Sequence, residues 1–191
     1  MSNHLESLKK AYPLFKSKLT LQEFIPRVNS LETEIKWNFV RASLLYQQAL
    51  KCKNCEPNVA MALLCSCADA MKIAGGDAGS RENFKKFYLD YCSTDLRGPP
   101  IEYYPNGRLP SQIAPFEKAL DFIYSKFRCL YVHEGIGRLE NLPSGVKWIS
   151  ATILDVYNGE CYNVDTVKIL EWFAKITAES LYQFLLKHPH S

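Results

Sequence analysis

The chain has 191 residues, of which 47% are apolar and 13% aromatic; this is enough to build one domain around a hydrophobic core and excludes an intrinsically disordered protein. Its 23 Lys and Arg residues nearly balance 20 Asp and Glu residues, so the formal charge of +3 does not by itself indicate a nucleic-acid-binding protein. Any basic binding surface must therefore be local.

Sorting signals and metal ligands are the next classes to consider. No run approaches the roughly 18 apolar residues that a membrane span needs, and the first residues lack the pattern of a signal peptide. The seven cysteines are an odd number, and several lie inside apolar helical patterns, which favours a reducing compartment. Cys52 and Cys55 have CxxC spacing, but no second CxxC follows. We therefore expect a soluble cytoplasmic protein without a membrane contact, metal or cofactor.

The N-terminal part is divided by prolines. Residues 1–30 contain short apolar segments stopped by Pro13 and Pro26, which indicates an N-terminal arm packed on the body. The helical domain then spans 31–191. Its first helix follows Asn29, with Glu32 three places later in a capping-box-like arrangement, and ends near 51–54.

The second and third helices differ in their outer faces. Pro57 opens a helix that is apolar on almost all sides, as expected for a helix in the middle of a bundle. Asp69 and Lys72 interrupt its apolar surface, and we expect them to pair with each other. The third helix follows a cap at Ser80, and its apolar stripe is Phe84, Phe87, Tyr88 and Tyr91. Its other face carries Arg81, Lys85 and Lys86. These side chains either follow a phosphate backbone or form a solvated charged face.

A long loop is predicted over 93–115, because prolines and glycines are frequent there. Its Tyr103, Tyr104 and Arg108 could stack on bases or meet a partner. The alternative is that the tyrosines pin the loop to the core.

The fourth helix is predicted over 116–135. Its buried stripe is Phe116, Leu120, Ile123, Phe127 and Leu130, and the neighbouring stripe is Asp121, Tyr124, Arg128 and Tyr131. The segment 146–157, followed by Asn158-Gly159, predicts one small β-hairpin, and Asp165 opens the final helix. Together these elements predict an all-α fold, an antiparallel bundle of four to five helices with at most one small hairpin.

An arginine, four intervening residues and a histidine stand at the end of the fourth helix, Arg128 and His133. This pattern resembles the HEPN superfamily, whose hallmark is an R-x(4-6)-H motif in a four- to five-helix domain. Tyr124 and the ending VHEG are also similar to that family, and the resemblance covers roughly residues 31–187.

The resemblance implies a metal-independent endoribonuclease that is active as a homodimer. It also implies the toxin half of a toxin–antitoxin or phage-defence system, with a nucleotidyltransferase-like antitoxin as partner. His133, with an ordinary pKa of about 6.5, would exchange a proton with the ribose 2′-hydroxyl or the leaving 5′-oxygen. Arg128 would hold the scissile phosphate. The expected RNA-binding side chains are Tyr124, Tyr131, Arg81, Lys85 and Arg108.

The spacing of the motif sets a geometric condition. Residues five apart in an ideal helix are separated by about 140° around its axis, so Arg128 and His133 converge only if the helix loosens before Gly135 or the site is a dimer cleft. The competing interpretation is structural. Arg128 would form an ion pair with Asp121 or Glu134, and the His133 cation would interact favourably with the negative C-terminal end of the helix dipole.

The residue after the arginine departs from the family pattern. Cys129 stands where the family usually has Asn, Asp or His, and a thiol is a weak hydrogen-bonding substitute. A non-catalytic HEPN-like module that binds RNA, a nucleotide or a protein is therefore the alternative function. A purely structural dimerising protein is a third.

Overall fold

The computed structural model describes residues 2–71, 80–105, 110–129, 152–157 and 160–188. The helices are α1 (Ser2–Ala11), α2 (Leu21–Asn29), α3 (Thr33–Cys52), α4 (Pro57–Ala70), α5 (Arg81–Tyr91), α6 (Phe116–Ile123) and α8 (Thr166–Lys187). The strands are β1 (Ile101–Tyr104), β2 (Gln112–Ile113), β3 (Thr152–Tyr157) and β4 (Glu160–Asp165). The chain is thus mostly helical, as predicted. No helix in these ranges is both long and apolar enough to cross a membrane.

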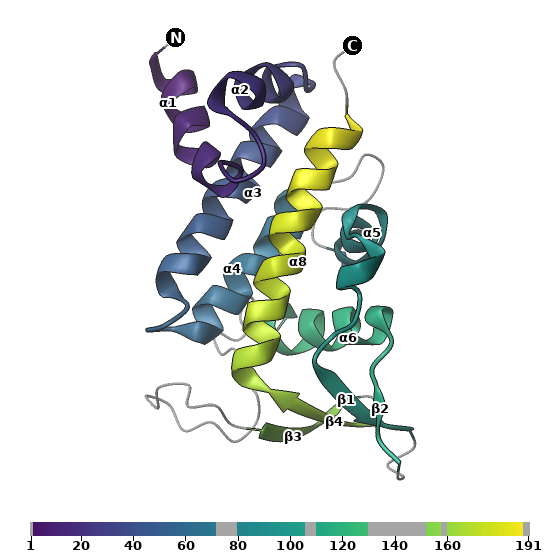
Figure 1. The fold of residues 1–191 in the computed structure, drawn as a ribbon. Coiled ribbons are helices and arrows are strands. Elements are labelled where there is room, and N and C mark those ends of the chain that lie inside the picture. Colours follow the sequence, from purple (N-terminus) through teal and green to yellow (C-terminus); the bar gives the residue numbers. More distant parts are fainter. Residues whose placement is uncertain (1, 72–79, 106–109, 130–151, 158–159, 189–191) are drawn as a thin grey trace.

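The first 30 residues fold as α1, a short 3-10 turn (Tyr12–Leu14) and α2, which lie against α3 at one end of the molecule (Figure 1). The ring of Phe15 stacks on Phe24 at 5.1 Å and on Phe39 of α3 at 5.4 Å between centroids. The N-terminal segment therefore contributes to the same hydrophobic core as the body.

The predicted N-terminal cap at Asn29 is wrong. Asn29 is the last residue of α2, and Glu32, which precedes α3, makes no side-chain capping bond. The capping box lies earlier, at Thr20 and Glu23, where each side chain bonds the backbone N–H of the other. The pair Thr20 and Glu23 was not predicted from the sequence, and the predicted pair Asn29 and Glu32 forms no capping box.

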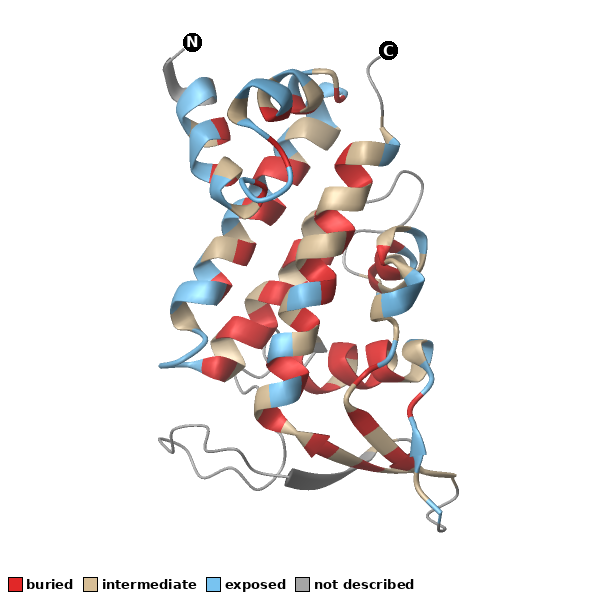
Figure 2. Cartoon of the chain, viewed as in Figure 1, coloured by how far each residue is buried: buried red, intermediate tan, exposed pale blue. Residues whose placement is uncertain are grey.

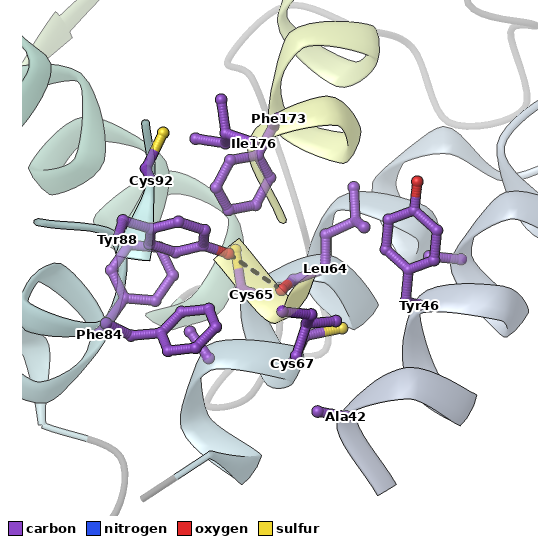
Figure 3. Packing of buried hydrophobic residues seen from close by; sticks show 14 of the residues in the cluster. Ala42, Tyr46, Leu64, Cys65, Cys67, Phe84, Tyr88, Cys92, Phe173 and Ile176 are labelled. Atoms are coloured by element: carbon purple, nitrogen blue, oxygen red, sulfur yellow. Dashed lines mark hydrogen bonds between the residues drawn. The ribbon is translucent and has the colours of Figure 1, made fainter. Parts of the chain in front are cut away.

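The centre of the fold is α4, which contacts α3, α5 and α8. Its apolar residues are buried on more than one side, as the red segments of Figure 2 show. In Figure 3, Tyr88 of α5 meets Phe173 of α8 and Cys65 of α4 in this core. The Tyr88 hydroxyl lies 3.0 Å from the Thr177 hydroxyl, so its polar group is satisfied inside the core.

A four-stranded antiparallel sheet, in the order β2-β1-β4-β3, lies at the opposite end from α1 and α2 (Figure 1). The predicted hairpin is present, because β3 pairs with β4 and Tyr157 is opposite Glu160. The predictions of a structureless loop over 93–115 and of at most one hairpin are wrong, because β1 and β2 form there and β1 pairs with β4. Tyr103 of β1 stacks on Tyr162 of β4 at 6.2 Å and is buried, so this tyrosine does pin the segment to the core.

The expected single helix over 116–135 is also corrected. The α-helix α6 ends at Ile123, and a π-helical segment, Tyr124–Cys129, continues from it. Residues beyond 129 in the predicted helix lie outside the described residues. Phe122 stacks on Tyr162 at 4.8 Å, which attaches this helix to the sheet.

Candidate active site

The π-helical segment carries the arginine of the motif. Its backbone closes i→i+5 turns in place of the α-helical i→i+4 turns, so residues five apart lie nearer to one face than in an α-helix. The helix is therefore loosened as far as Cys129, and the rest of the backbone between Arg128 and His133 lies outside the described residues. His133, Tyr131 and Arg108 lie outside the described residues.

Tyr124, the first residue of the π segment, lies beside two predicted site residues. The Arg81 guanidinium carbon is 5.7 Å from the centre of its ring, and that of Arg128 is 5.3 Å away. The ring is 5% exposed, so both cations meet a largely desolvated aromatic surface, where a cation–π contact is strongest. The structure thus brings together three of the predicted site residues, from α5 and from the π segment.

A polar relay joins these residues to the sheet. Arg81 Nη2 donates to Ser125 Oγ at 3.1 Å, and Ser125 Oγ donates to the Tyr157 hydroxyl of β3 at 2.9 Å. The relay fixes the exposed Arg81 side chain, which would otherwise have many rotamers. Neither Ser125 nor Tyr157 carries a sequence signal that would have placed it here.

The ion pair of Arg128 is formed with Asp69 at the end of α4. Arg128 Nε donates to Asp69 Oδ2 at 2.9 Å, and the two side chains are 16% and 19% exposed. Asp121, one of the two expected partners, pairs with Lys85 instead. Glu134, the other expected partner, and Lys72, the expected partner of Asp69, lie outside the described residues. Periodicity could not identify this contact, because it joins residues 59 positions apart. It occupies one N–H of a guanidinium that has five.

Lys85 is bound by carboxylates. Its Nζ lies 3.2 Å from Asp121 Oδ2 and 3.8 Å from Glu117 Oε2, both on α6. Its side chain is only 14% exposed and bridges α5 and α6. It therefore does not lie on an open surface where a phosphate backbone could bind. Lys86 lies 3.7 Å from Asp90 on its own helix. Of the basic face predicted on the third helix, Arg81 is the residue that reaches Tyr124.

Two buried cysteines, Cys67 of α4 and Cys92 directly after α5, are unsuited to thiol chemistry. Burial raises the pKa of the Cys67 thiol on α4 far above its ordinary value, and burial raises that of Cys92 to about 11. Both thiols therefore stay protonated at neutral pH, and a protonated thiol is a poor nucleophile. No group of three or more His, Cys, Asp or Glu side chains within the described ranges could hold a metal ion.

The assembled side chains offer forked cationic donors beside an aromatic ring. Such a group can bind a phosphate through the guanidinium N–H groups, whereas the Tyr124 ring is buried against the two arginines and Phe84 and supports them. No protein-family model, curated protein or solved structure matches this chain.

Proposed function

We propose that the chain is a HEPN-type, metal-independent endoribonuclease that acts as a homodimer in a toxin or defence role. The observation that carries the proposal is the position of Arg128. It lies in a π-helical segment, against the ring of Tyr124 that Arg81 also contacts, and five residues before His133 in the sequence. π-Helical segments are rare and are frequent at functional sites.

In this mechanism His133 takes the proton of the ribose 2′-hydroxyl, and the 2′-oxygen attacks the adjacent phosphorus. The bond from phosphorus to the 5′-oxygen breaks, the leaving oxygen receives a proton, and the products are a 2′,3′-cyclic phosphate and a 5′-hydroxyl. Arg128 donates N–H groups to the phosphate oxygens on which charge builds. Arg81, which is exposed, holds the flanking phosphate, and the buried Tyr124 ring supports Arg81 and Arg128.

Two copies of the chain supply the cleft in this proposal. A single ribose phosphate bound between the two protomers would contact Arg128 and His133 from both of them. The two side chains of one protomer would then not need to point in the same direction. Tyr131 and Arg108 belong to the proposed RNA-binding surface by sequence alone. A nucleotidyltransferase-like antitoxin is the proposed partner that keeps such a toxin inactive.

The test is cleavage of a generic RNA in the presence of a metal chelator. The parent is expected to cut RNA and leave a 2′,3′-cyclic phosphate. His133→Ala is expected to lose activity by about 100-fold or more, the usual contribution of a general acid or base. His4→Ala, another histidine removed from the same chain, is the matched control and should cleave like the parent. Equal cleavage by the parent and His133→Ala would overturn the proposal.

A second function is favoured by a different observation. The Asp69 carboxylate already bonds Arg128 Nε at 2.9 Å, and Cys129 replaces the polar residue of the family. A non-catalytic module that binds RNA through Arg81, with Tyr124 supporting the arginine side chain, fits these two features. It predicts that RNA binds without being cut, and that Arg81→Gln weakens binding.

A further inference from the structure

A groove with a volume of about 690 Å³ lies on a different part of the molecule from the motif. It is bounded by α8, by the connection between α3 and α4, and by the turn that follows α1. The lining residues of α8 recur from Val167 to Tyr182 on one stripe, so the groove follows this helix for about 22 Å. Its volume falls within the roughly 300–1,000 Å³ of small-molecule sites.

Small side chains create the space. Ala174 and Ala178 of α8 lie in the groove wall, and Ala49 of α3 lines it as well. The floor is apolar, with Phe15 and Leu64 buried beside them. The groove therefore offers an elongated apolar surface, which a hydrocarbon chain would remove from water at about 25 cal/mol per Å².

The hydroxyl group of Tyr46 reaches the groove from a largely buried ring. Tyr46 of α3 is 7% exposed, and its hydroxyl group forms no hydrogen bond with any residue that the structure describes. In Figure 3 this oxygen points away from the ring cluster around Tyr88. Burial raises the pKa of Tyr46 to about 12, so the group stays a neutral donor. The hydroxyl oxygen is open to the groove, so a polar ligand atom that lies there can form a hydrogen bond with it.

The charges that line the groove favour an anion. Lys18 and Glu179 pair with each other. Lys53 and Lys175 also line the groove, and neither forms an ion pair with a residue in the described part of the chain. Among the lining residues that the structure describes, Glu171 is the one carboxylate beside these two lysines, so this part of the lining carries one more positive than negative charge.

We propose that this groove binds an elongated amphiphile with a hydrocarbon body and one carboxylate, that is, a long-chain fatty acid. The hydrocarbon lies along α8 between the alanines, and the carboxylate meets Lys53 or Lys175 and accepts a hydrogen bond from the Tyr46 hydroxyl. This inference does not depend on the ribonuclease proposal, because it uses none of the motif residues.

The test measures saturable binding of dansyl-undecanoate to the full chain at low salt, with displacement by palmitate and by the neutral analogue hexadecanol. Palmitate should displace the probe and hexadecanol should do so at least fivefold less well. Ala174→Phe, which fills the groove, should weaken binding at least tenfold. Tyr46→Phe should weaken it roughly two- to tenfold through the lost hydrogen bond.

The matched charge variants are Lys53→Glu and Lys51→Glu. Both residues are exposed, but only Lys53 lines the groove, so Lys53→Glu alone should weaken binding, by roughly two- to fivefold. Circular dichroism and thermal melting show that each variant is folded. No saturable binding, equal displacement by the alcohol, or unchanged binding by Ala174→Phe and Tyr46→Phe would overturn the proposal. Self-association of the parent that Ala174→Phe abolishes would assign the groove to a second copy and overturn it too.

Discussion

Replacing Asp69 by Asn tests the contact that holds Arg128. The substitution keeps the shape of the side chain and removes the charge that accepts from Arg128 Nε at 2.9 Å. Both side chains are less than one-fifth exposed, and hydrogen bonds to charged groups at such sites contribute about 1.5–3 kcal/mol. The amide can still accept one weaker bond, so we expect a loss of about 1–3 kcal/mol in the free energy of unfolding. For a chain of this size that corresponds to a fall of roughly 2–12 °C in Tm.

The assay is urea unfolding followed by circular dichroism, with Asp90→Asn as the matched control. Asp90 pairs with Lys86 at 3.7 Å on an exposed helix face, so the control should change stability by no more than about 0.5 kcal/mol. A double-mutant cycle with Arg128→Gln should return a coupling energy of about 1 kcal/mol or more. Asp69→Asn should also weaken RNA binding at low salt, because Arg128 loses the group that orients it. The reasoning is refuted if Asp69→Asn matches Asp90→Asn and shows no coupling to Arg128.

Three further changes test the fold around the site. Phe173→Ala removes a fully buried ring of the central core and should cost about 3–5 kcal/mol by denaturant unfolding. Thr20→Ala removes the hydroxyl that accepts from the Glu23 N–H and should cost about 0.5–2 kcal/mol in the same assay. The hydrogen bond from Lys118 holds the pKa of Glu160 below its ordinary value, and the stability that this provides is present above pH 4.5 and lost as the pH falls through the lowered pKa. Unfolding measured between pH 7 and pH 3 should therefore show a steeper loss of stability for the parent than for Glu160→Gln.

The contradicting outcomes differ for the three changes. A cost below about 1 kcal/mol for Phe173→Ala would mean that this part of the core is loosely packed. A neutral Thr20→Ala would remove the capping box as a stabilising element. Parallel pH profiles for the parent and Glu160→Gln would show that the pair with Lys118 does not form in solution.

The helices of this chain were predictable where a local signal was decisive. Pro57, Ser80 and Asp165 each stand at a helix start, and each of these starts was expected from the sequence. The strands β1 and β2 were missed because Pro and Gly dominate the segment around them. β1 is placed by its pairing with β4, a contact between segments about 60 residues apart, and β2 pairs with β1. Periodicity does not report such contacts.

The candidate site was predictable in its residues and only partly in its contacts. The sequence identified Arg128, Tyr124 and Arg81, which the structure places together. It assigned Lys85 to RNA, whereas Lys85 pairs with carboxylates of α6, because a helix pattern shows which face is charged but not which helix covers that face. The partnership of Asp69 with Arg128 was missed for the same reason. The role of His133 remains a proposal from the motif.

The most direct test of the ribonuclease proposal is the product of RNA treated with the purified chain and a metal chelator. The account predicts fragments that end in 2′,3′-cyclic phosphate from the parent and from His4→Ala, and a loss of about 100-fold or more with His133→Ala or with Arg128→Gln. RNA that stays intact with the parent, or is cut equally well by His133→Ala, would contradict it.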